Sequence, residues 1–255
     1  MGGALATAAA KCQETKVLIT DTDSEKSSAL AKKIKAKSTT AEEICKTAKY
    51  IFLGVKPQIL PDVLSEIAPL LKERHDRYIL VSMAAGVKCE KIANQLNGSV
   101  RIIRIMPNMP VAVGGGMVLY TATKNVTKKE KKEFVALMQN AGVFDEISEE
   151  LIDAASAVSG CGPAFVFMFM DALADGGVQC GLSREQALKY AAETVLGSAK
   201  MLLQTNKHPI ELKDAVCSPK GSTIEGVYAL ENADFKVTVM KAVDKSFKRT
   251  KELGK

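Results

Sequence analysis

Short apolar runs alternate with amphipathic segments from residue 16 to about residue 146, and this alternation constrains the fold more than any other feature. A short apolar run is typical of a buried strand, whereas apolar residues three and four positions apart are typical of a helix. In this way the pattern predicts strands and helices in turn, at residues 16–20, 24–35, 50–55, 59–72, 78–82, 90–96, 101–106, 117–121, 128–140 and 143–146.

The predicted strands are apolar at almost every position, as in a parallel sheet that helices cover on both faces. We therefore predict an α/β fold with a doubly wound, Rossmann-like parallel sheet, and we assign residues 1–148 to a dinucleotide-binding domain of this kind. After Glu146 the pattern is helical throughout. We assign residues 149–255 to an all-α domain for dimerisation and substrate binding.

One segment of this second domain predicts an oligomer. Residues 164–180 form a helical pattern that is apolar on all sides, and such a helix must be buried all round. A domain of about 105 residues has little interior to offer it. We therefore expect burial against a second copy of the chain, in a dimer or a multiple of dimers.

The beginning of the chain lacks the first strand that such a sheet requires. A dinucleotide-binding sheet opens with a strand and a GxGxxG turn, which holds the pyrophosphate at a helix N-terminus. Here Met1-Gly2 leads directly into a helical pattern. We expect a gap between strand 16–20 and either strand 50–55 or strand 78–82, and weak dinucleotide binding by this 255-residue form.

Composition excludes several other classes of protein. The net charge of +6 lies mostly on amphipathic helical segments, and aromatic residues are only 5%, so we expect no nucleic-acid partner. The sequence contains no uninterrupted apolar run of about eighteen residues, so we expect no membrane span. The six cysteines form no CxxC pair, which argues against a metal site or a disulfide framework and favours the cytoplasm.

Polar and proline-rich motifs follow three predicted strands, where ligands gather in open α/β sheets. Asp21 follows strand 16–20, at the position of the residue that meets the adenosine ribose, and favours NADH over NADPH; the alternative is a turn or helix cap. Val55-Lys56-Pro57 and Met106-Pro107-Asn108 end two further strands. The second motif predicts a wall beside the nicotinamide, or else a structural crossover.

Two segments of the helical half suit an anionic ligand. Ser159–Ala164 (SGCGPA) and Ser218–Ile224 (SPKGSTI) place small or hydroxyl-bearing residues at helix starts, where free backbone N–H groups attract carboxylates. The alternative interpretation is a pair of capped helices.

These motifs occur together in one known family. The stretches FLGVKP, SMAAGV, RIMPNMP, SGCGPA and SPKGSTI begin at Phe52, Ser82, Arg104, Ser159 and Ser218, and in this order the chain resembles the pyrroline-5-carboxylate reductases. The resemblance implies hydride transfer from NADPH or NADH to a small cyclic imine, which yields proline. It also implies a homodimer whose helical domains interlock.

The resemblance further implies roles for particular residues. Thr223 is the catalytic candidate, and the substrate-binding candidates are Ser218, Lys220, Gly221, Ser222, Cys161 and Gly162. The cofactor-binding candidates are Met1, Gly2, Asp21, Val55, Lys56, Pro57, Ala84, Ala85, Met106, Pro107 and Asn108.

The chain departs from the family pattern at two of these positions. Lys220 stands where the family usually has glycine, at a cost of roughly 1 kcal/mol if that position needs a positive φ. Cys161 replaces a common serine. Two alternatives stay open: a related imine or 2-hydroxyacid oxidoreductase, and a non-catalytic homologue.

Overall fold

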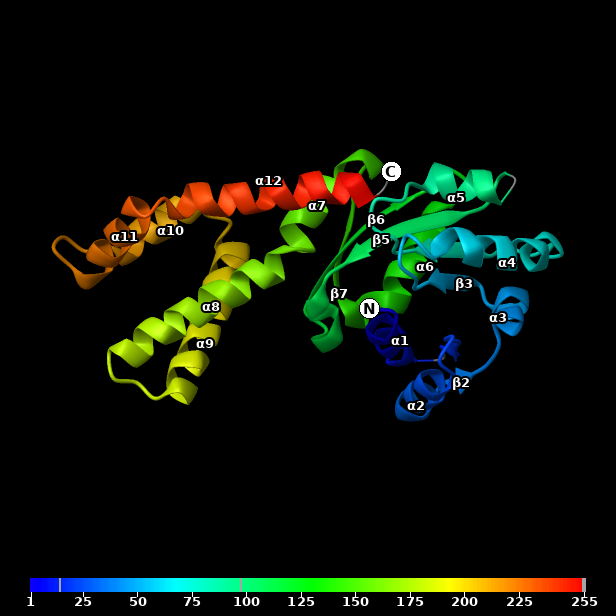
Figure 1. Ribbon diagram of the computed structural model, residues 1–255, viewed down its shortest axis with the longest axis horizontal. Helices are drawn as coiled ribbons and strands as arrows, with labels where there is room; N and C mark the ends of the chain where they lie inside the picture. The colour runs from blue at the N-terminus through cyan, green and yellow to red at the C-terminus, as the bar shows by residue number, and fades with distance from the viewer. Residues whose placement is uncertain (14, 97, 254–255) are drawn as a thin grey trace. The chain divides into compact units, whose positions relative to one another are not determined.

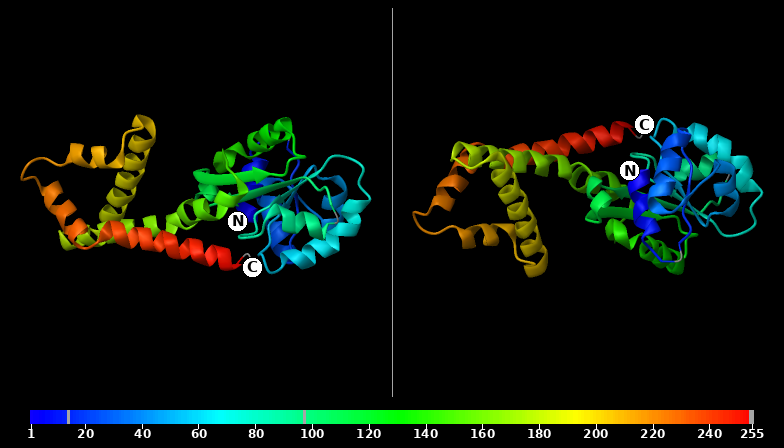
Figure 2. Two further views of the ribbon diagram at one scale, coloured as in Figure 1. Left: turned by 90° about the horizontal axis from the view of Figure 1, so that it is seen from above. Right: turned by 90° about the horizontal axis from the view of Figure 1, so that it is seen from below.

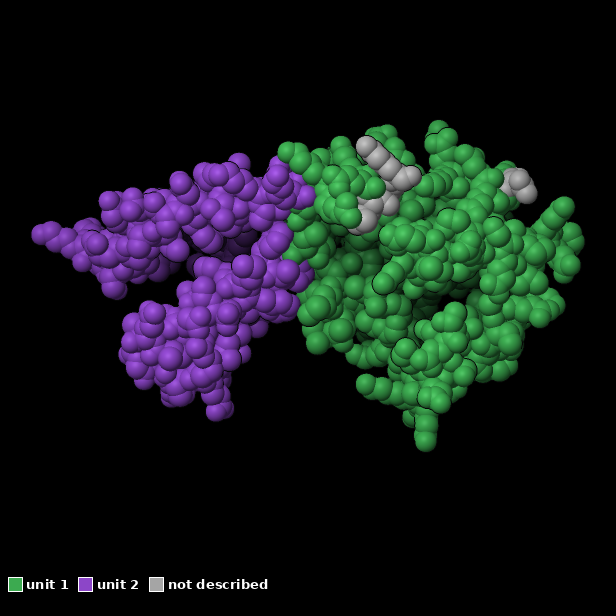
Figure 3. Space-filling model, viewed as in Figure 1, with its two compact units in different colours: residues 1–161, 246–255 green, residues 162–245 purple. Residues whose placement is uncertain are grey.

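A computed structural model describes residues 1–13, 15–96 and 98–253 of the chain. The chain divides into two compact units (Figure 3). The sheet unit comprises residues 1–161 and 246–255, and the helical unit comprises residues 162–245. We describe each unit by itself. The domain boundary at residue 148 stays a prediction.

The sheet unit contains the helices and strands that the apolar pattern predicts, in the predicted order, together with further elements (Figure 1). Its elements are α1 (Gly2–Ala10), β1 (Leu18–Ile19), α2 (Ser24–Ile34), β2 (Lys37–Ser38), α3 (Ala41–Thr47), β3 (Tyr50–Leu53), α4 (Leu60–Lys72), β4 (Ile79–Ser82), α5 (Cys89–Gln95), β5 (Ile102–Pro107), η1 (Met109–Val113), β6 (Gly116–Ala122), α6 (Lys128–Met138), η2 (Gln139–Ala141), β7 (Gly142–Glu146), η3 (Glu149–Leu151) and α7 (Ile152–Ser159).

Five strands form the main sheet in the order β3-β4-β5-β6-β7. β3, β4 and β5 are parallel, with Phe52 opposite Val81 and Val81 opposite Ile103. β6 runs antiparallel to β5, whereas β7 is parallel to β6. The predicted doubly wound α/β fold is confirmed, with one correction: the sheet is mixed, because η1 returns the chain directly beside β5 without a crossover helix.

Helices cover both faces of this sheet. Successive side chains of β4 and β5 point to opposite faces. Ile79 and Val81 pack with Ile103 and Ile105 against α1 and α6, in a cluster that contains Phe134. The opposite face packs against α3, α4 and α5, through Leu80, Ile102, Cys45, Leu64 and Ile92. This two-sided burial explains why β4 and β5 are apolar at almost every position.

A gap divides the sheet between β1 and β3. In the part of the chain that the structure describes, β1 pairs only with β2, in parallel, and β3 pairs only with β4. The expected gap is therefore confirmed. The helix α1 joins the two parts, since Leu5 belongs to the main core and Gly3 lies close to Leu30 of α2.

The apolar pattern did not predict β2 or α3. β2 contains only Lys37 and Ser38, so it has no apolar run to reveal it. The α3 helix has just seven residues, of which Cys45 alone is buried. Its N-terminus nevertheless has a recognisable N-cap residue, Thr40, whose hydroxyl accepts a hydrogen bond from Glu43 N.

The helical unit begins with α8 (Gly162–Gln179) and α9 (Arg184–Thr205), which pack side by side (Figures 1 and 2). The chain continues through α10 (Pro209–Val216), α11 (Ser222–Asn232) and α12 (Phe235–Leu253), the last of which ends in the sheet unit. The predicted helix over 164–180 is thus confirmed as α8.

One chain leaves most of α8 uncovered. Ala174 is its only buried residue, and Phe167 and Met168 are 49% and 73% exposed. Among the described residues, one helical run, residues 149–179, has the length and composition that could cross a membrane, yet only 11% of its most apolar window is buried. A helix that is buried in the core of a large protein has the same apolar composition.

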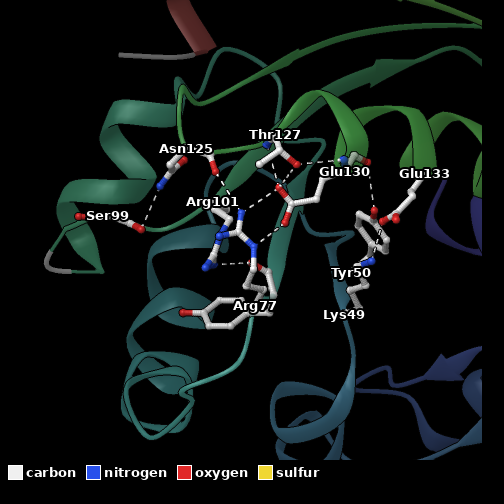
Figure 4. A network of polar contacts seen from close by, with 10 residues as sticks. Lys49, Tyr50, Arg77, Ser99, Arg101, Asn125, Thr127, Glu130 and Glu133 are labelled. Atoms are coloured by element: carbon white, nitrogen blue, oxygen red, sulfur yellow. Dashed lines mark hydrogen bonds and ion pairs between the residues drawn. The ribbon is translucent and has the colours of Figure 1, made fainter.

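A network of polar contacts fastens α6 to the sheet (Figure 4). Glu130, which is 7% exposed, accepts hydrogen bonds from Arg77 Nε and Nη2 at 2.9 and 3.0 Å. It also closes a capping box with Thr127. Its carbonyl accepts a hydrogen bond from the Tyr50 hydroxyl. The Arg77 bonds, followed by those from Thr127, lower the pKa of Glu130 from 4.5 to about 2.

Replacing Glu130 with Gln should lower the free energy of unfolding at pH 7 by about 1–3 kcal/mol, because charged hydrogen bonds to Arg77 are lost. The folded-state pKa of Glu130 is depressed, so its contribution is complete above pH 4.5 and is lost as the pH falls from 4.5 towards 2. Urea denaturation at fixed protein concentration measures this.

The matched control is Glu133→Gln, since Glu133 makes a more exposed ion pair with Lys49 and should cost less than about 1 kcal/mol. Equal losses in the two variants at pH 7 would contradict the special role of Glu130.

Candidate active site

The carboxyl ends of β3, β4 and β5 meet at one edge of the sheet, because these three strands are parallel. Three predicted motifs follow these ends directly. Residues 55–57 follow β3, Ala84 and Ala85 follow β4, and Asn108 follows β5. The structure therefore brings the predicted cofactor residues of the three strands to a common edge.

The N-terminus of α1 lies at the same edge, beside the end of β3. A Cβ atom added to Gly54 would lie 3.7 Å from the Gly2 Cα, so the two backbones approach closely. Met1 is the N-cap residue of α1, and its side chain caps no backbone N–H. The first turn thus presents backbone donors next to Val55 and Lys56, and these residues fit a dinucleotide's phosphate oxygens.

Asp21 lies two residues beyond the end of β1 and is exposed. Its Oδ1 accepts hydrogen bonds from Asp23 N at 3.0 Å and from the Thr22 hydroxyl at 3.4 Å. Asp23 is the cap of α2, and the Lys26 ammonium beside it lowers the pKa of the Asp23 carboxyl. Asp21 therefore shapes the turn with one oxygen, and its Oδ2 receives no hydrogen bond from the described residues.

The residues after β4 are packed against the protein. Ala84 is 1% exposed, and its N–H donates to the Ser82 hydroxyl at 3.4 Å. Ala85 packs against the small core cluster of Met106, Leu119 and Ile152. Because Ala84 and Ala85 have small side chains, this turn places no bulky group at the edge of the sheet.

Met106, Pro107 and Asn108 are all buried. Asn108 Oδ1 accepts a hydrogen bond from Met117 N at 2.9 Å, and Asn108 Nδ2 donates to the Ser159 carbonyl at 2.9 Å. The side chain therefore ties β5 to β6 and to α7. The sequence did not predict either contact, and the cofactor contact of Asn108 stays a prediction.

Sequence reasoning also missed a buried charge beside this edge. Arg104 has a side chain that is 1% exposed. It pairs with Asp153 at 2.7 Å and with Glu149 at 3.5 Å. Glu149 also accepts a hydrogen bond from Cys89 N. Burial and the nearby Glu149 raise the pKa of the Cys89 thiol to about 12, so this cysteine stays protonated and inert. A lone arginine inside an apolar strand was the available signal.

Cys161 and Gly162 lie at the junction of the two units. Cys161 is half-buried, and its N–H donates to the Ser156 carbonyl at 3.1 Å. Gly160 N donates to the same carbonyl at 2.8 Å. Gly162 is the first residue of α8. The turn between α7 and α8 is therefore tight.

The helical unit gathers the other substrate candidates in one turn. Gly221 N donates to the Ser218 carbonyl at 3.0 Å, with Pro219 and Lys220 between them. Lys220 has φ 59°, which corresponds to the third residue of a type II turn. The condition stated for Lys220, a backbone position with positive φ, is thus met. Glycine is favoured there, so lysine costs roughly 1 kcal/mol.

This turn leads into an uncapped helix. Gly221 is the N-cap of α11, and no side chain accepts from the first turn of that helix. The N–H groups of Ser222 and Thr223 are therefore available to an anion, next to three exposed hydroxyls. Ser218, Ser222 and Thr223 supply those hydroxyls.

Comparison with known proteins places this arrangement in a family. Residues 149–253 match the family model "Pyrroline-5-carboxylate reductase dimerisation", and residues 1–86 match "NADP oxidoreductase coenzyme F420-dependent". Pyrroline-5-carboxylate reductase of Escherichia coli (strain K12) is 42% identical over 216 residues, which is 85% of this chain and 79% of the relative. Pyrroline-5-carboxylate reductase 2 of Homo sapiens is 41% identical over 83% of this chain and 66% of the relative.

A solved structure agrees with the sequence relatives. The crystal structure of Plasmodium falciparum pyrroline carboxylate reductase with NADP bound has a TM-score of 0.87 and 32% sequence identity, over all of this chain and 95% of the other. With two relatives above 40% identity and a shared fold, the chain belongs to the pyrroline-5-carboxylate reductase family.

Proposed function

We propose that this protein reduces 1-pyrroline-5-carboxylate to L-proline, with NADPH or NADH as the hydride donor. The observation that carries this proposal is the Ser218–Thr223 turn, which presents hydroxyls and free N–H groups at the start of α11. It occurs in a chain that is 42% identical to a reductase of this name. The alternatives of a 2-hydroxyacid oxidoreductase and a non-catalytic homologue have no comparable support.

The substrate's carboxylate is an anion, and the turn presents N–H groups and hydroxyls that can donate hydrogen bonds to an anion. We assign Ser218, Gly221 and Ser222 to carboxylate binding through hydroxyl and backbone donors. Lys220 adds a positive charge on the same turn. Cys161 and Gly162 are further proposed substrate-binding residues.

Thr223 is the proposed catalytic residue. A protonated imine is already a good electrophile, so the reaction needs alignment more than a strong acid. A hydroxyl suits this role, because it can hydrogen-bond to the ring nitrogen and keep the C=N carbon facing the hydride donor. A nicotinamide bound here would supply a hydride, which is one proton with two electrons, to that carbon, and the ring nitrogen would keep its proton as the amine of proline.

The cofactor residues lie at the carboxyl edge of the sheet. Met1, Gly2 and the Val55–Pro57 turn are proposed to contact the pyrophosphate, and Asp21 the adenosine ribose. Ala84, Ala85, Met106 and Pro107 are proposed to line the nicotinamide side. The close approach of Gly2 and Gly54 supports this assignment, because it leaves backbone rather than side chains facing the phosphates.

We also propose a cytoplasmic homodimer, or a multiple of dimers, held together by residues 149–255. The dimerisation family model begins at residue 149, at the boundary that we assign. The apolar surface of α8 supports the dimer, because Phe167, Met168 and Leu188 line a groove with a volume of about 580 Å³ in the isolated chain. An apolar groove of that size favours a protein partner.

Asp21 should favour NADH, because its carboxylate repels the 2′-phosphate of NADPH. The variant Asp21→Ser should raise the ratio of kcat/KM for NADPH to that for NADH by roughly 5-fold, since two charges about 4 Å apart interact by about 1 kcal/mol in water. Asp62→Ser, an exposed acid in the first turn of α4, is the control. A wild-type protein that clearly prefers NADPH would show that our interpretation of Asp21 is wrong.

Two hydroxyl variants separate binding from chemistry. Thr223→Ala should lower kcat, whereas Ser218→Ala should raise KM for the imine roughly 10- to 150-fold, the equivalent of about 1.5–3 kcal/mol for one charged hydrogen bond. The assay is NADPH or NADH oxidation with 1-pyrroline-5-carboxylate. Ser198→Ala, which removes an exposed hydroxyl bonded only within α9, is the control. Unchanged kinetics in both test variants would move the active site elsewhere.

Burial of α8 should make the protein an obligate oligomer, with more than about 2,000 Å² in its interface. Phe167→Glu should dissociate it, because an unpaired charge cannot be buried in an apolar contact. Sedimentation velocity measures the change. Val113→Glu, an 84% exposed site in the sheet unit, should leave the oligomer intact. A folded wild-type monomer would refute the proposed dimer.

A further inference from the structure

Two side chains of β5, and Asn108 just beyond its end, contact the helix α7 near both of its ends. Arg104 pairs with Asp153 in the first turn of α7. Met106 packs against Ile152 in the small core cluster. Asn108 donates to the carbonyl of Ser159, the last residue of the helix. Asn108 thus holds the end of α7 from which the chain continues to α8.

The Ser159 carbonyl lacks the partner that a continuing helix would give it. In an α-helix this carbonyl would accept the N–H of the residue four positions later, which here is Pro163. Proline has no backbone N–H. The Asn108 side chain therefore supplies a hydrogen bond that the sequence of α7 and α8 cannot supply.

Only an amide side chain fits between these two partners. Asn108 is 9% exposed, accepts from Met117 N and donates to Ser159 O, each at 2.9 Å. An aspartate would keep the first bond but place a carboxylate against a carbonyl oxygen. A serine is too short to make both bonds. Loss of either bond in a buried place leaves a polar group unsatisfied.

The segment fixed in this way leads directly into proposed substrate residues. Beyond Ser159, the N–H groups of Gly160 and Cys161 both donate to the Ser156 carbonyl, so the turn is compact. A Cβ atom at Gly160 would lie 2.8 Å from that carbonyl oxygen, so the turn packs closely on α7 and leaves no space for a side chain at this position. Its direction therefore depends on what anchors its first residue, Ser159.

We infer that Asn108 is a positioning residue for the reaction: it orients the Ser159–Gly162 turn by replacing the hydrogen bond that Pro163 cannot donate. This inference rests on the proposed function for its effect on catalysis. In this role Asn108 acts through Cys161 and Gly162, so its loss should impair the chemical step and spare dinucleotide binding. The cofactor contact predicted from the sequence motif would give the opposite result.

The test compares Asn108→Asp with Asn125→Asp in the full chain. Asn125 is a matched control, because its Nδ2 also donates to a backbone carbonyl, that of Ser99, but at an exposed site (Figure 4). Asn108→Asp should lower kcat by about 10- to 100-fold, as expected for a misplaced catalytic segment. The Kd for NADPH, titrated directly, should stay within about twofold of wild type.

Hydrogen exchange gives a readout that does not depend on activity. Amide exchange in a peptide covering residues 152–162 should accelerate in Asn108→Asp and stay unchanged in Asn125→Asp. If Asn108→Asp fails to fold, Asn108→Ser replaces it, because serine is too short to make both hydrogen bonds and adds no charge. A second check is the double variant with Pro163→Ala, which restores a backbone N–H and should reduce the effect of the Asn108 change.

The outcomes separate this inference from the proposed function. Unchanged exchange in residues 152–162 overturns the positioning role. A Kd for NADPH that rises as much as kcat falls also overturns it, and assigns Asn108 to cofactor contact instead. If the wild-type protein reduces no 1-pyrroline-5-carboxylate, the proposed function fails, whereas faster exchange in Asn108→Asp still supports the positioning role.

Discussion

The complete burial of β4 and β5 is the constraint on which the sheet unit depends. Every residue of Ile79–Ser82 and of Ile102–Pro107 is buried, on both faces of the sheet. Burial of apolar surface contributes roughly 25 cal/mol per Å², so these strands need helices on both sides. With both faces covered, the ends of the strands are where the chain can open towards a ligand. The site lies at that edge because the faces are occupied.

Much of the fold follows from the sequence because burial leaves a periodic signature. The α4 helix and the strands β3 to β5 were predicted to within three residues, since their apolar residues recur at helical or strand spacing. β2 and α3 escaped prediction, because they bury almost nothing. The strand β6 was predicted at residues 117–121, but its antiparallel direction was not, because an apolar strand has the same pattern in either direction.

The features of the candidate site also divide into those that the sequence predicts and those that it does not. The turns that carry glycine, proline and hydroxyl residues were predictable, because these residues restrict the local backbone whatever lies around them. Lys220 shows this directly, since its positive φ follows from the turn that Ser218 and Gly221 form. The contacts of Arg104 with Asp153 and of Asn108 with Ser159 join residues about 50 positions apart. No local pattern encodes such pairs.

The gap between β1 and β3 has a consequence for the local unfolding of the protein. The β1–β2 pair and α2 share no strand hydrogen bonds with the main sheet in the described residues, and they are joined to it by side-chain packing through α1. Backbone ladders are what make neighbouring strands open and close together. The segment that carries Asp21 is therefore a separate cooperative unit, which can unfold locally while the five-stranded sheet stays intact. The proposed contact of Asp21 with the ribose would therefore depend on the local folding of the β1–β2 segment.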